Sequence, residues 1–279
     1  MSLSAPATSR SSGGAPRPAL TVVVPTKNEE ANVESCIRAF DAVRDRVEIV
    51  VIDNVSTDRT RAIAASLGAR VLEQGPERSA QRNRGWREAQ AARVLFVDAD
   101  MIVLKETIDE ILATREDLAL YVPETRVGHG LRLRARNFER SFYDGTCIDA
   151  LRVIPRDLLE KVGGYDEVLV ACEDWDLDRR LKAAGARTAI TTGALLHNEA
   201  RQDLKRLLAK KAYYARSVDR YRAKWGEDDI TRRQFGLKYR YFGVFIERGK
   251  WRRLFRHPIL AAVMYAERFL VGLVYLVNR

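Results

Sequence analysis

The chain has 279 residues, of which 46% are hydrophobic and 31% charged, with three cysteines and a formal net charge of +10. This length allows one large α/β domain or two small ones, and the composition excludes collagen-like, coiled-coil and wholly disordered chains. Three widely spaced cysteines exclude a disulfide scaffold and a cysteine-based zinc site, and they favour a reduced, cytoplasmic setting.

The first 19 residues are mostly Ser, Ala, Pro and Gly. They lack the apolar segment that a signal peptide requires. We therefore predict a disordered leader over residues 1–19.

Short apolar segments alternate with helical stretches between residues 20 and 98. The apolar, β-branched segments predict buried strands, and the stretches between them have the apolar spacing of three and four that is typical of helices. The predicted strands are 20–24, 47–52, 70–72 and 94–97, and the predicted helices are 33–43, 60–67 and 80–92. Such alternation predicts a parallel, doubly wound sheet. The sequence contains no Gly-rich dinucleotide or P-loop motif.

The middle of the chain is less regular. Residues 118–122 and 188–191 predict strands, and residues 177–184 predict a helix that stops at Gly185. Residues 126–140 are rich in arginine and contain two glycines, so we predict a mobile loop there. Together with the first half, these elements predict one α/β domain over residues 20–200.

The last part of the chain carries the positive charge. Residues 201–257 hold 18 Lys and Arg against 6 Asp and Glu, whereas the rest of the chain holds 30 against 32. A segment this basic faces phosphate, nucleic acid or a lipid surface, unless it is simply a solvated helix face. We predict a basic, aromatic, helical region over residues 201–279 that associates with an anionic membrane surface.

Residues 259–277 are apolar apart from Glu267, Arg268 and Gly272. A membrane-spanning helix needs about 20 apolar residues, and each charge at its centre costs roughly 2.5–3.5 kcal/mol. The two adjacent charges therefore favour either a helix in the membrane interface or a helix packed on the domain.

Two carboxylates directly follow the fourth predicted strand, at Asp98 and Asp100. If the strand alternation continued, both side chains would point the same way and would repel each other unless a cation lay between them. Hard oxygen ligands suit Mg²⁺ or Mn²⁺, which usually also hold phosphate oxygens. The alternative is a pair of acidic loop residues that caps the next helix.

A second acidic cluster spans residues 173–176 (EDWD). Asp174 is placed to cap a helix or to act as a general base, and the sequence leaves both interpretations open. Asp176 and Arg180 are four residues apart, which predicts a surface ion pair along one helix.

Five segments, in order, resemble the motifs of family 2 glycosyltransferases. They lie between about residues 20 and 197, and they are residues 24–30 (VPTKNEE), 51–60 (VIDNVSTDRT), 78–85 (RSAQRNRG), 98–100 (DAD), and the pair 162–167 (VGGYDE) with 173–177 (EDWDL). The resemblance implies the GT-A fold, a Rossmann-like, mainly parallel sheet flanked by helices, here with a basic, amphipathic helical extension at the C-terminus.

The resemblance also implies roles for single residues on the donor side. Pro25, Thr26, Glu29 and Asp53 would line the pocket for the base and ribose of a nucleotide-sugar. Arg82 would approach its diphosphate.

The remaining implied roles concern the metal and the transfer step. Asp98 would contact the ribose and the metal, and Asp100 would be the principal ligand of Mn²⁺ or Mg²⁺. Glu173 would join the nucleotide-sugar-binding residues, and Asp174 would deprotonate the acceptor. His197 follows the last predicted strand, where some relatives place a metal or phosphate ligand, although a lone histidine is more often structural.

Two residues depart from the family pattern, since Asn54 stands for a second Asp and Lys27 for a frequent Tyr. Both substitutions fall in the nucleotide pocket, so the choice between UDP and GDP stays open.

The expected function is a metal-dependent, inverting glycosyltransferase. Its donor would be a UDP- or GDP-linked sugar, and its acceptor a polyprenyl phosphate or a lipid-linked saccharide. We expect a cytoplasmic protein, peripheral on the inner face of the plasma membrane, that acts in cell-envelope glycan or glycolipid synthesis.

Three alternative functions compete with this one. Tyr213, Tyr214, Tyr221 and Trp225 interleave with basic residues, as in proteins that bind single-stranded nucleic acid. No nucleic-acid-binding motif accompanies them, so we expect no nucleic acid partner. A sugar-phosphate nucleotidyltransferase would carry a Gly-rich loop after the first strand, which is absent from this sequence. The intact acidic motifs argue against a catalytically inactive member of the family.

Overall fold

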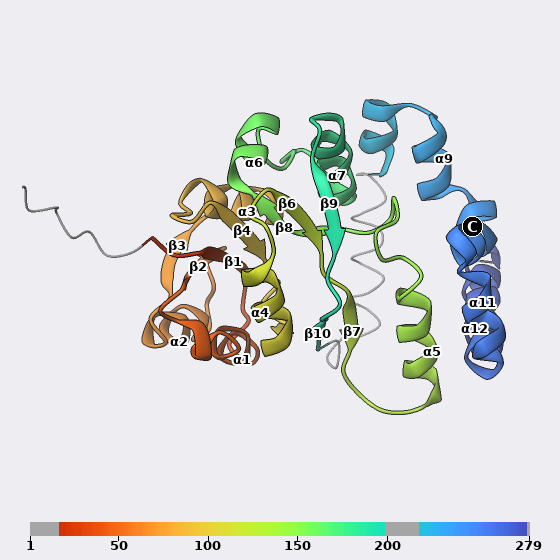
Figure 1. Ribbon diagram of the computed structural model, residues 1–279, viewed down its shortest axis with the longest axis horizontal. Helices are drawn as coiled ribbons and strands as arrows, with labels where there is room; N and C mark the ends of the chain where they lie inside the picture. The colour runs from red at the N-terminus through yellow and green to blue at the C-terminus, as the bar shows by residue number, and fades with distance from the viewer. Residues whose placement is uncertain (1–16, 199–217, 278–279) are drawn as a thin grey trace, which may run out of the picture.

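The computed structural model describes residues 17–198 and 218–277. A seven-stranded sheet forms the middle of the molecule, and helices cover it on both faces (Figure 1). The strand order is β3-β2-β1-β4-β8-β6-β9. These strands are β1 (Leu20–Thr26), β2 (Val47–Asp53), β3 (Arg70–Glu73), β4 (Arg93–Phe96), β6 (Leu118–Tyr121), β8 (Leu151–Pro155) and β9 (Arg187–Ile190).

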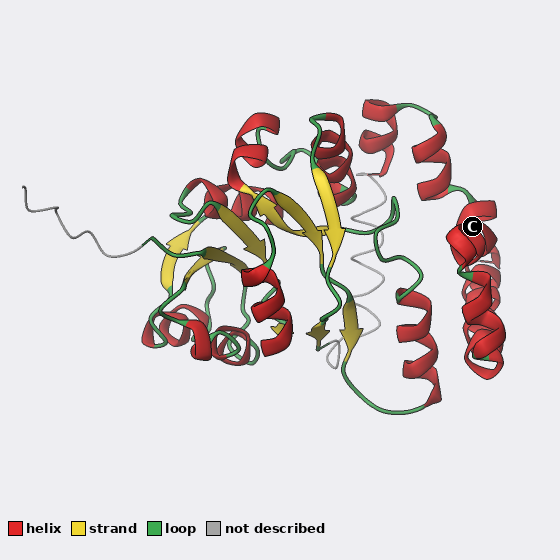
Figure 2. Cartoon of the chain, in the orientation of Figure 1, coloured by secondary structure: helices red, strands yellow, loops and turns green. Residues whose placement is uncertain are grey.

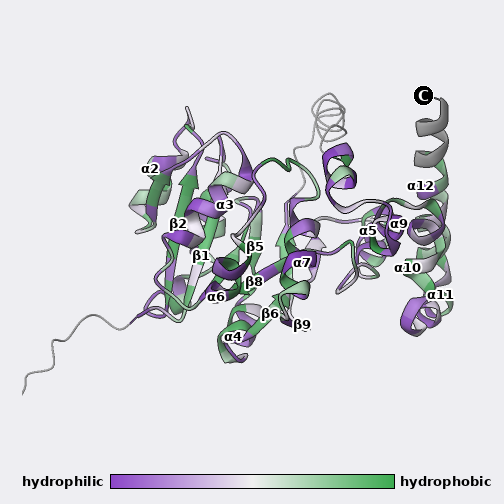
Figure 3. Cartoon of the chain, turned by 90° about the horizontal axis from the view of Figure 1, so that it is seen from above, coloured by the Kyte–Doolittle hydropathy of each residue, from purple (hydrophilic) through white to green (hydrophobic). Residues whose placement is uncertain are grey.

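The first four strands run parallel, as the alternation of strands and helices predicts. β8 is antiparallel to both of its neighbours, β4 and β6, while β6 and β9 are parallel. The sheet is therefore mainly parallel with one reversed strand. Figure 3 shows hydrophobic residues along the inner strands and hydrophilic ones along α3.

A second, three-stranded sheet lies beside the carboxyl end of β4. It consists of β5 (Met101–Val103), β10 (Leu195–His197) and β7 (Glu124–Arg126), with β10 in the middle. Residues 97–100 leave the main sheet through a turn, in which Met101 N–H donates to the Asp98 carbonyl oxygen at 2.9 Å. The alternation that we expected to align Asp98 with Asp100 is therefore wrong, because the strand ends at Phe96.

The helices around the main sheet are α1 (Val33–Arg38), η1 (Asp41–Val43), α2 (Thr60–Ser66), α3 (Arg78–Arg87), α4 (Lys105–Ala113), α6 (Arg156–Val162) and α7 (Glu173–Ala183). Helices were predicted at the positions of α1 with η1, α2, α3 and α7, with ends that differ by up to about five residues, whereas α4 and α6 were not predicted. Gly85 lets α3 approach β1, because a Cβ there would lie 2.2 Å from a methyl carbon of Val23. This close contact brings the Arg82 side of α3 onto the carboxyl end of the sheet.

The arginine-rich segment 126–140 is not a mobile loop. It completes β7 and then forms the helix α5 (Leu131–Arg140). Leu131, Ala135 and Phe138 recur at a helical spacing, and the last two are buried, so one face of α5 packs while the arginines occupy the others. Figure 2 shows α5 as a regular helix beside the C-terminal helices.

The C-terminal region is helical and packs on α5. Its elements are residues 218–225, α9 (Asp229–Phe235), η2 (Tyr239–Gly243), α10 (Val244–Ile246), η3 (Glu247–Gly249), α11 (Trp251–Arg256) and α12 (Pro258–Val277). Phe138 and Phe142 share a core cluster with Val244, Phe245 and Met264. The predicted leader over residues 1–19 lies mostly outside the described residues, and so do residues 201–217 of the helical region predicted over residues 201–279.

The two central charges of α12, Glu267 and Arg268, both form ion pairs. Glu267 pairs with Arg132 at 2.8 Å, and Arg268 pairs with Glu139 and donates to the Tyr143 hydroxyl, so both charges face α5. Packing on the domain, one of the two expected arrangements, is therefore what α12 adopts over this stretch. A bilayer-spanning helix is not found in the described part of the chain, where no helix combines enough length with enough apolar character.

Candidate active site

The ends of β1 and β2 form a buried polar corner. The Thr26 hydroxyl donates to Asp53 at 2.9 Å, and the Gln81 amide from α3 donates to the carbonyl oxygens of Thr26 and Ile52 at 2.9 and 2.7 Å. Asp53 is fully buried, and it also accepts the Ser56 backbone N–H at 2.8 Å. This corner fixes the loop after β2, as a pocket for a planar base and ribose requires.

The turn after β1 is tied to the same loop. Asn28 adopts a φ of 54°, donates its backbone N–H to Ser56 and accepts from Thr57, each at 2.8 Å. Pro25, the neighbour of Thr26, is paired in register with Ile52. The four predicted base and ribose residues are therefore held by one set of contacts that joins the two strand ends.

Glu29 is half-buried on this turn and accepts the Asn32 amide at 2.8 Å. Burial raises its pKa, and the negative charges of Asp100 and Asp98 add to that effect. Glu29 thus faces the same space as the two carboxylates that follow β4.

Asn83 holds the loop of the GGYDE motif against α3. Its amide accepts the Tyr165 N–H at 2.8 Å and donates to the Tyr165 carbonyl at 2.9 Å. Gly164 has a φ of 75°, and a Cβ there would lie 2.4 Å from the Asn83 side-chain oxygen. These motif residues therefore have a structural role, which is to place α7 beside Arg82.

Arg82 is the centre of the site. Only 1% of it is exposed, and it reaches Asp174 at 2.9 Å, Asp98 at 3.1 Å and Glu173 at 3.5 Å. Burial alone would lower its pKa, but these carboxylates raise it well above the usual arginine value. Arg82 thus links Asp98, on the donor side, to Asp174, the residue implied as the base. Both terminal nitrogens of Arg82 contact carboxylates.

Asp98 lies among three arginines. Besides Arg82, it has Arg78 at 3.6 Å and Arg152 at 3.9 Å. Burial opposes its ionisation, but the three positive charges outweigh that effect and hold the pKa of Asp98 well below its usual range. Asp98 is therefore an anion that the protein itself neutralises.

Asp100 faces a different partner. Its carboxylate lies 3.2 Å from His197 Nε2, and its side chain is 31% exposed. Residues 17–198 and 218–277 contain no group of three or more His, Cys, Asp or Glu side chains arranged to hold a metal. The three-residue ligand set of Asp98, Asp100 and His197 is thus not preformed.

The pair formed by Asp100 and His197 still fits Mn²⁺ or Mg²⁺. It offers a carboxylate oxygen and an imidazole nitrogen in a partly open position, and hard divalent ions commonly take their remaining ligands from phosphate oxygens. We therefore regard these two residues as the ones able to hold the ion, with Asp98 beside them.

Two residues that the sequence analysis missed, the buried Arg152 and the partly buried Glu124, connect Asp98 to the His197 partner of Asp100. Glu124 of β7 hydrogen bonds to Arg152 and lies 3.9 Å from His197 Nδ1 and 3.7 Å from Arg140. Burial raises its pKa, but Arg152 and Arg140 reverse the effect and bring the pKa of Glu124 to about 2. Neither Glu124 nor Arg152 belongs to a recognisable motif, and both lie on short strands.

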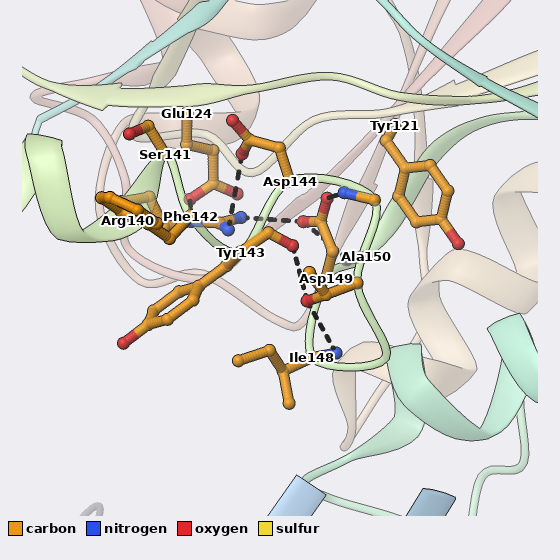
Figure 4. A network of polar contacts seen from close by, with 12 residues as sticks. Tyr121, Glu124, Arg140, Ser141, Phe142, Tyr143, Asp144, Ile148, Asp149 and Ala150 are labelled. Atoms are coloured by element: carbon orange, nitrogen blue, oxygen red, sulfur yellow. Dashed lines mark hydrogen bonds and ion pairs between the residues drawn. The ribbon is translucent and has the colours of Figure 1, made fainter. Parts of the chain in front are cut away.

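Figure 4 shows how the connection continues away from the site. Arg140 lies between Glu124, Asp144 and Asp149, and its distance to Asp149 is 3.0 Å. Desolvation by burial, followed by the negative charge of Asp149, raises the pKa of Asp144 to about 6. The chain of ionic contacts therefore runs from α7 through α3, the turn after β4, β8 and β7 into α5.

Glu173 and Asp174 begin α7. Burial, together with the charge of Asp174, raises the pKa of Glu173 to about 7, against the lowering effect of Arg82. The N-cap of α7 is Cys172, so Asp174 lies inside the first turn of the helix, and its side chain contacts Arg82. This arrangement favours the base interpretation over the helix cap.

Asp176 does form the predicted pair with Arg180, at 2.8 Å, but it is buried rather than on the surface. Trp225 and Lys224 contact its other oxygen at 2.9 and 2.7 Å. Tyr221 is fully buried, and Arg179 lies 3.9 Å from the Trp225 ring. These two aromatic residues therefore pack on α7 and are not available to stack on bases, while Tyr213 and Tyr214 lie outside the described residues.

Comparisons with known proteins agree with this geometry. The family model described as "Glycosyl transferase family 2" matches residues 21–128. Glucosyl-3-phosphoglycerate synthase of Mycobacterium tuberculosis is 36% identical over 94 residues, which cover 30% of this chain and 29% of that protein. The matched part thus spans less than a third of this curated relative.

Solved structures match over much more of the chain. The mannosyltransferase PcManGT from Pyrobaculum calidifontis, in complex with GDP-Man and Mn²⁺, is 19% identical with a TM-score of 0.59, covering 94% of this chain and 81% of that one. S. aureus TarS 1–349, in complex with UDP-GlcNAc, is 18% identical with a TM-score of 0.60, covering 88% and 79%. The fold is therefore the predicted GT-A fold with a helical C-terminal extension. Residues 21–128 are therefore similar to the catalytic domain of family 2 glycosyltransferases.

Proposed function

We propose that the protein is a metal-dependent, inverting glycosyltransferase that moves a sugar from a nucleotide-sugar to a hydroxyl or phosphate acceptor. The observation that carries this proposal is the unbroken contact from Asp174 through Arg82 to Asp98, with Asp100 and His197 beside it. A base, a positive centre and a pair able to hold a divalent ion thus surround one end of the sheet.

Each of these residues has a separate role in a single in-line displacement. Asp174 accepts the proton of the attacking hydroxyl, and Arg82 keeps that carboxylate in place. Arg78 and Arg152 add positive charge near Asp98, where the departing diphosphate gains negative charge. A bound Mn²⁺ or Mg²⁺ would stabilise the same charge as a Lewis acid.

The donor pocket is the polar corner of Thr26 and Asp53 with Pro25 and Glu29. Relatives in complex with UDP, UDP-GlcNAc and GDP-Man support a nucleotide-sugar donor, linked to UDP or GDP. Complexes of two relatives with Mn²⁺ support manganese as the ion, to be held by Asp100 and His197.

The acceptor and the location are the finer part of the proposal. We propose a polyprenyl phosphate or lipid-linked saccharide acceptor, at the cytoplasmic face of the plasma membrane, in cell-envelope glycan or glycolipid synthesis. The basic C-terminal region supports this proposal, because it would bring the active site to anionic lipid. A curated relative named 4,4'-diaponeurosporenoate glycosyltransferase, from Staphylococcus aureus, is consistent with an apolar acceptor.

Thermal unfolding with nucleoside diphosphates tests the donor side of the proposal. UDP, GDP, CDP and dTDP would each be added with and without Mn²⁺. A ligand at 100 times its dissociation constant adds about 2.7 kcal/mol, which shifts the melting temperature of a domain of this size by roughly 2–4 °C per kcal/mol. We expect one diphosphate to stabilise the protein only with metal, whereas no shift with any of them would contradict the proposal.

A further inference from the structure

The C-terminal region exposes an unusual amount of apolar surface. Nine of the fourteen large hydrophobic side chains that are exposed among the described residues lie between residues 230 and 270. Ile230, Leu237, Phe242, Ile246, Trp251, Phe255, Ile259, Phe269 and Leu270 are exposed by 39–77%. Scattered apolar residues on a surface need no explanation, but such a concentration marks an interaction surface.

A pocket of about 630 Å³ opens in this surface, between α9 and α10. Tyr239, Phe242 and Ile246 supply part of its lining, and Arg232, Arg233 and Lys238 supply the rest of the side chains together with Asp229. Asp229 pairs with Arg232 at 2.6 Å, so two further positive charges line the pocket. The pocket is therefore cationic on one part of its lining and apolar on another.

The elements that form the pocket are fixed to the domain. The buried Gln234 amide donates to the Cys147 carbonyl at 2.8 Å, and Arg179 of α7 donates to the Thr231 hydroxyl at 3.0 Å. On the other side, Val244 and Phe245 are buried in the core cluster with Phe142. The pocket thus presents its charges from a held backbone rather than from a free tail.

The apolar surface continues from the pocket onto α12. Phe242 stacks on Tyr265 with ring centroids 6.5 Å apart, and Tyr265 stacks on Phe269 at 6.3 Å. Phe269 and Leu270 are 57% and 62% exposed. A ligand whose charged group lies in the pocket therefore has apolar surface next to it for hydrocarbon.

We propose that this pocket binds the phosphate group of an anionic membrane phospholipid, with Arg232, Arg233 and Lys238 around the phosphate and Phe242 and Ile246 against the acyl chains. Basic residues beside exposed apolar side chains are the usual combination at an anionic membrane surface. The exposed Leu237, Ile246 and Ile259 suit hydrocarbon, whereas binding to single-stranded nucleic acid depends on stacking aromatics. A second copy is disfavoured as the occupant, because a chain of net charge +10 would meet a basic surface.

This proposal rests on the membrane location proposed above and leaves the donor site untouched. Its test uses the full chain and vesicles that contain either phosphatidylcholine alone or phosphatidylcholine with phosphatidylglycerol. The test variant carries Arg232→Gln, Arg233→Gln and Lys238→Gln. The matched control carries Arg38→Gln, Lys105→Gln and Arg115→Gln, which remove three exposed charges elsewhere.

We expect the parent and the control to bind the anionic vesicles and not the neutral ones. The test variant should bind about a hundredfold more weakly, since each Lys or Arg near such a surface contributes on the order of 1 kcal/mol. A second variant, Phe242→Ser with Ile246→Ser, should also bind more weakly, and its loss should persist at high salt, where charge effects are screened.

Several outcomes would overturn the proposal. The test variant could bind vesicles as tightly as the control, or the parent could fail to bind them at all. Millimolar inorganic phosphate could displace the parent completely, which would identify a free phosphate site, and a single-stranded oligonucleotide could bind more tightly than vesicles at the same salt. A parent that is dimeric where the test variant is monomeric would identify a second copy as the occupant.

The donor measurement separates this proposal from the proposed function. If vesicle binding fails while one diphosphate still stabilises the protein with Mn²⁺, only the lipid site is wrong. If diphosphate stabilisation is also absent, the proposed function is contradicted as well. Melting temperatures of the test variant, the control and the Phe242→Ser, Ile246→Ser variant within a few degrees of the parent confirm that each is folded.

Discussion

Asp98 and Asp100 belong to one three-residue motif, yet they lie in opposite surroundings. Asp98 is held among Arg78, Arg82 and Arg152, so its charge is neutralised within the protein. Asp100 is more exposed, and its ionic partner within the described part of the chain is His197. The comparison separates an arginine side of the site, which supports both the fold and the chemistry, from a histidine side, which is open to an added ion.

The largest effect is expected at the arginine side, in catalysis. Asp174→Asn removes the proposed base but keeps an oxygen that Arg82 can donate to, so nucleotide binding should remain. General bases contribute typically 10²–10⁴-fold, and we expect transfer to fall by that factor. Single-turnover transfer and diphosphate binding, measured on the same preparation, check this. Full activity in Asp174→Asn would remove the residue from its role.

The next effect is on stability. Arg82→Met would leave Asp98, Glu173 and Asp174 close together without their shared partner. Breaking a buried ion pair by removing one member costs about 3–5 kcal/mol. Urea unfolding should report a loss of this size, and Arg84→Met, an exposed neighbour on the same helix, should lose less than about 1 kcal/mol. Equal losses in the two variants would show that Arg82 is not the centre of the site.

On the histidine side we expect lost ligand binding with little lost stability. Asp100→Asn should abolish the Mn²⁺-dependent stabilisation by a nucleoside diphosphate, about 2.7 kcal/mol at 100 times the dissociation constant. Without ligand, its melting temperature should match the parent, because Asp100 is partly exposed and supports no buried arginine. Asp98→Asn, in contrast, should lower the melting temperature of the protein in the absence of ligand. If both variants behave alike, the division into two sides is incorrect.

The smallest effect is a change in the pH dependence of stability. The pKa of Glu173 is about 7 in the fold and about 4.3 in an unfolded chain, so the folded state holds a proton that the unfolded state loses. Stability from this group is therefore full below pH 4 and falls as the pH rises toward 7. The melting temperature of Glu173→Gln should exceed that of the parent slightly at pH 5 and by more at pH 8.

Glu106→Gln, at an exposed glutamate on α4, provides the control for that experiment. It should follow the parent at both pH values. If Glu173→Gln shows no advantage at pH 8, then Glu173 is ionised in the folded protein.

The sequence predicted the parts of the site that follow strands. Asp53 and Asp98 come after apolar, parallel strands, so their shared position at one edge of the sheet follows from the pattern alone. Asp174 and Arg82 needed the family resemblance, because their contact joins α3 to α7 across 92 residues of sequence. Their roles remain predictions, and their contact is a finding of the structure.

Prediction from sequence failed where tertiary packing, and not the periodicity of apolar residues, determines the structure. β8 runs antiparallel in the middle of the sheet and carries the buried Arg152, which no apolar pattern reveals. The arginines of segment 126–140 suggested a loop, although the spacing of Leu131, Ala135 and Phe138 could have indicated α5. Glu124 has no recognisable signal, since its importance comes from the partners that surround it.

The packing of α12 and its neighbours on α5 has a consequence for how the protein folds during synthesis. Arg253 donates to the Ser141 carbonyl at 3.1 Å across 112 residues of sequence. At 5–20 residues per second, a ribosome needs on the order of ten seconds to make that interval. Throughout that time Phe138 and Phe142 lack the partners that bury them, so the nascent chain exposes this aromatic surface until its C-terminal helices emerge.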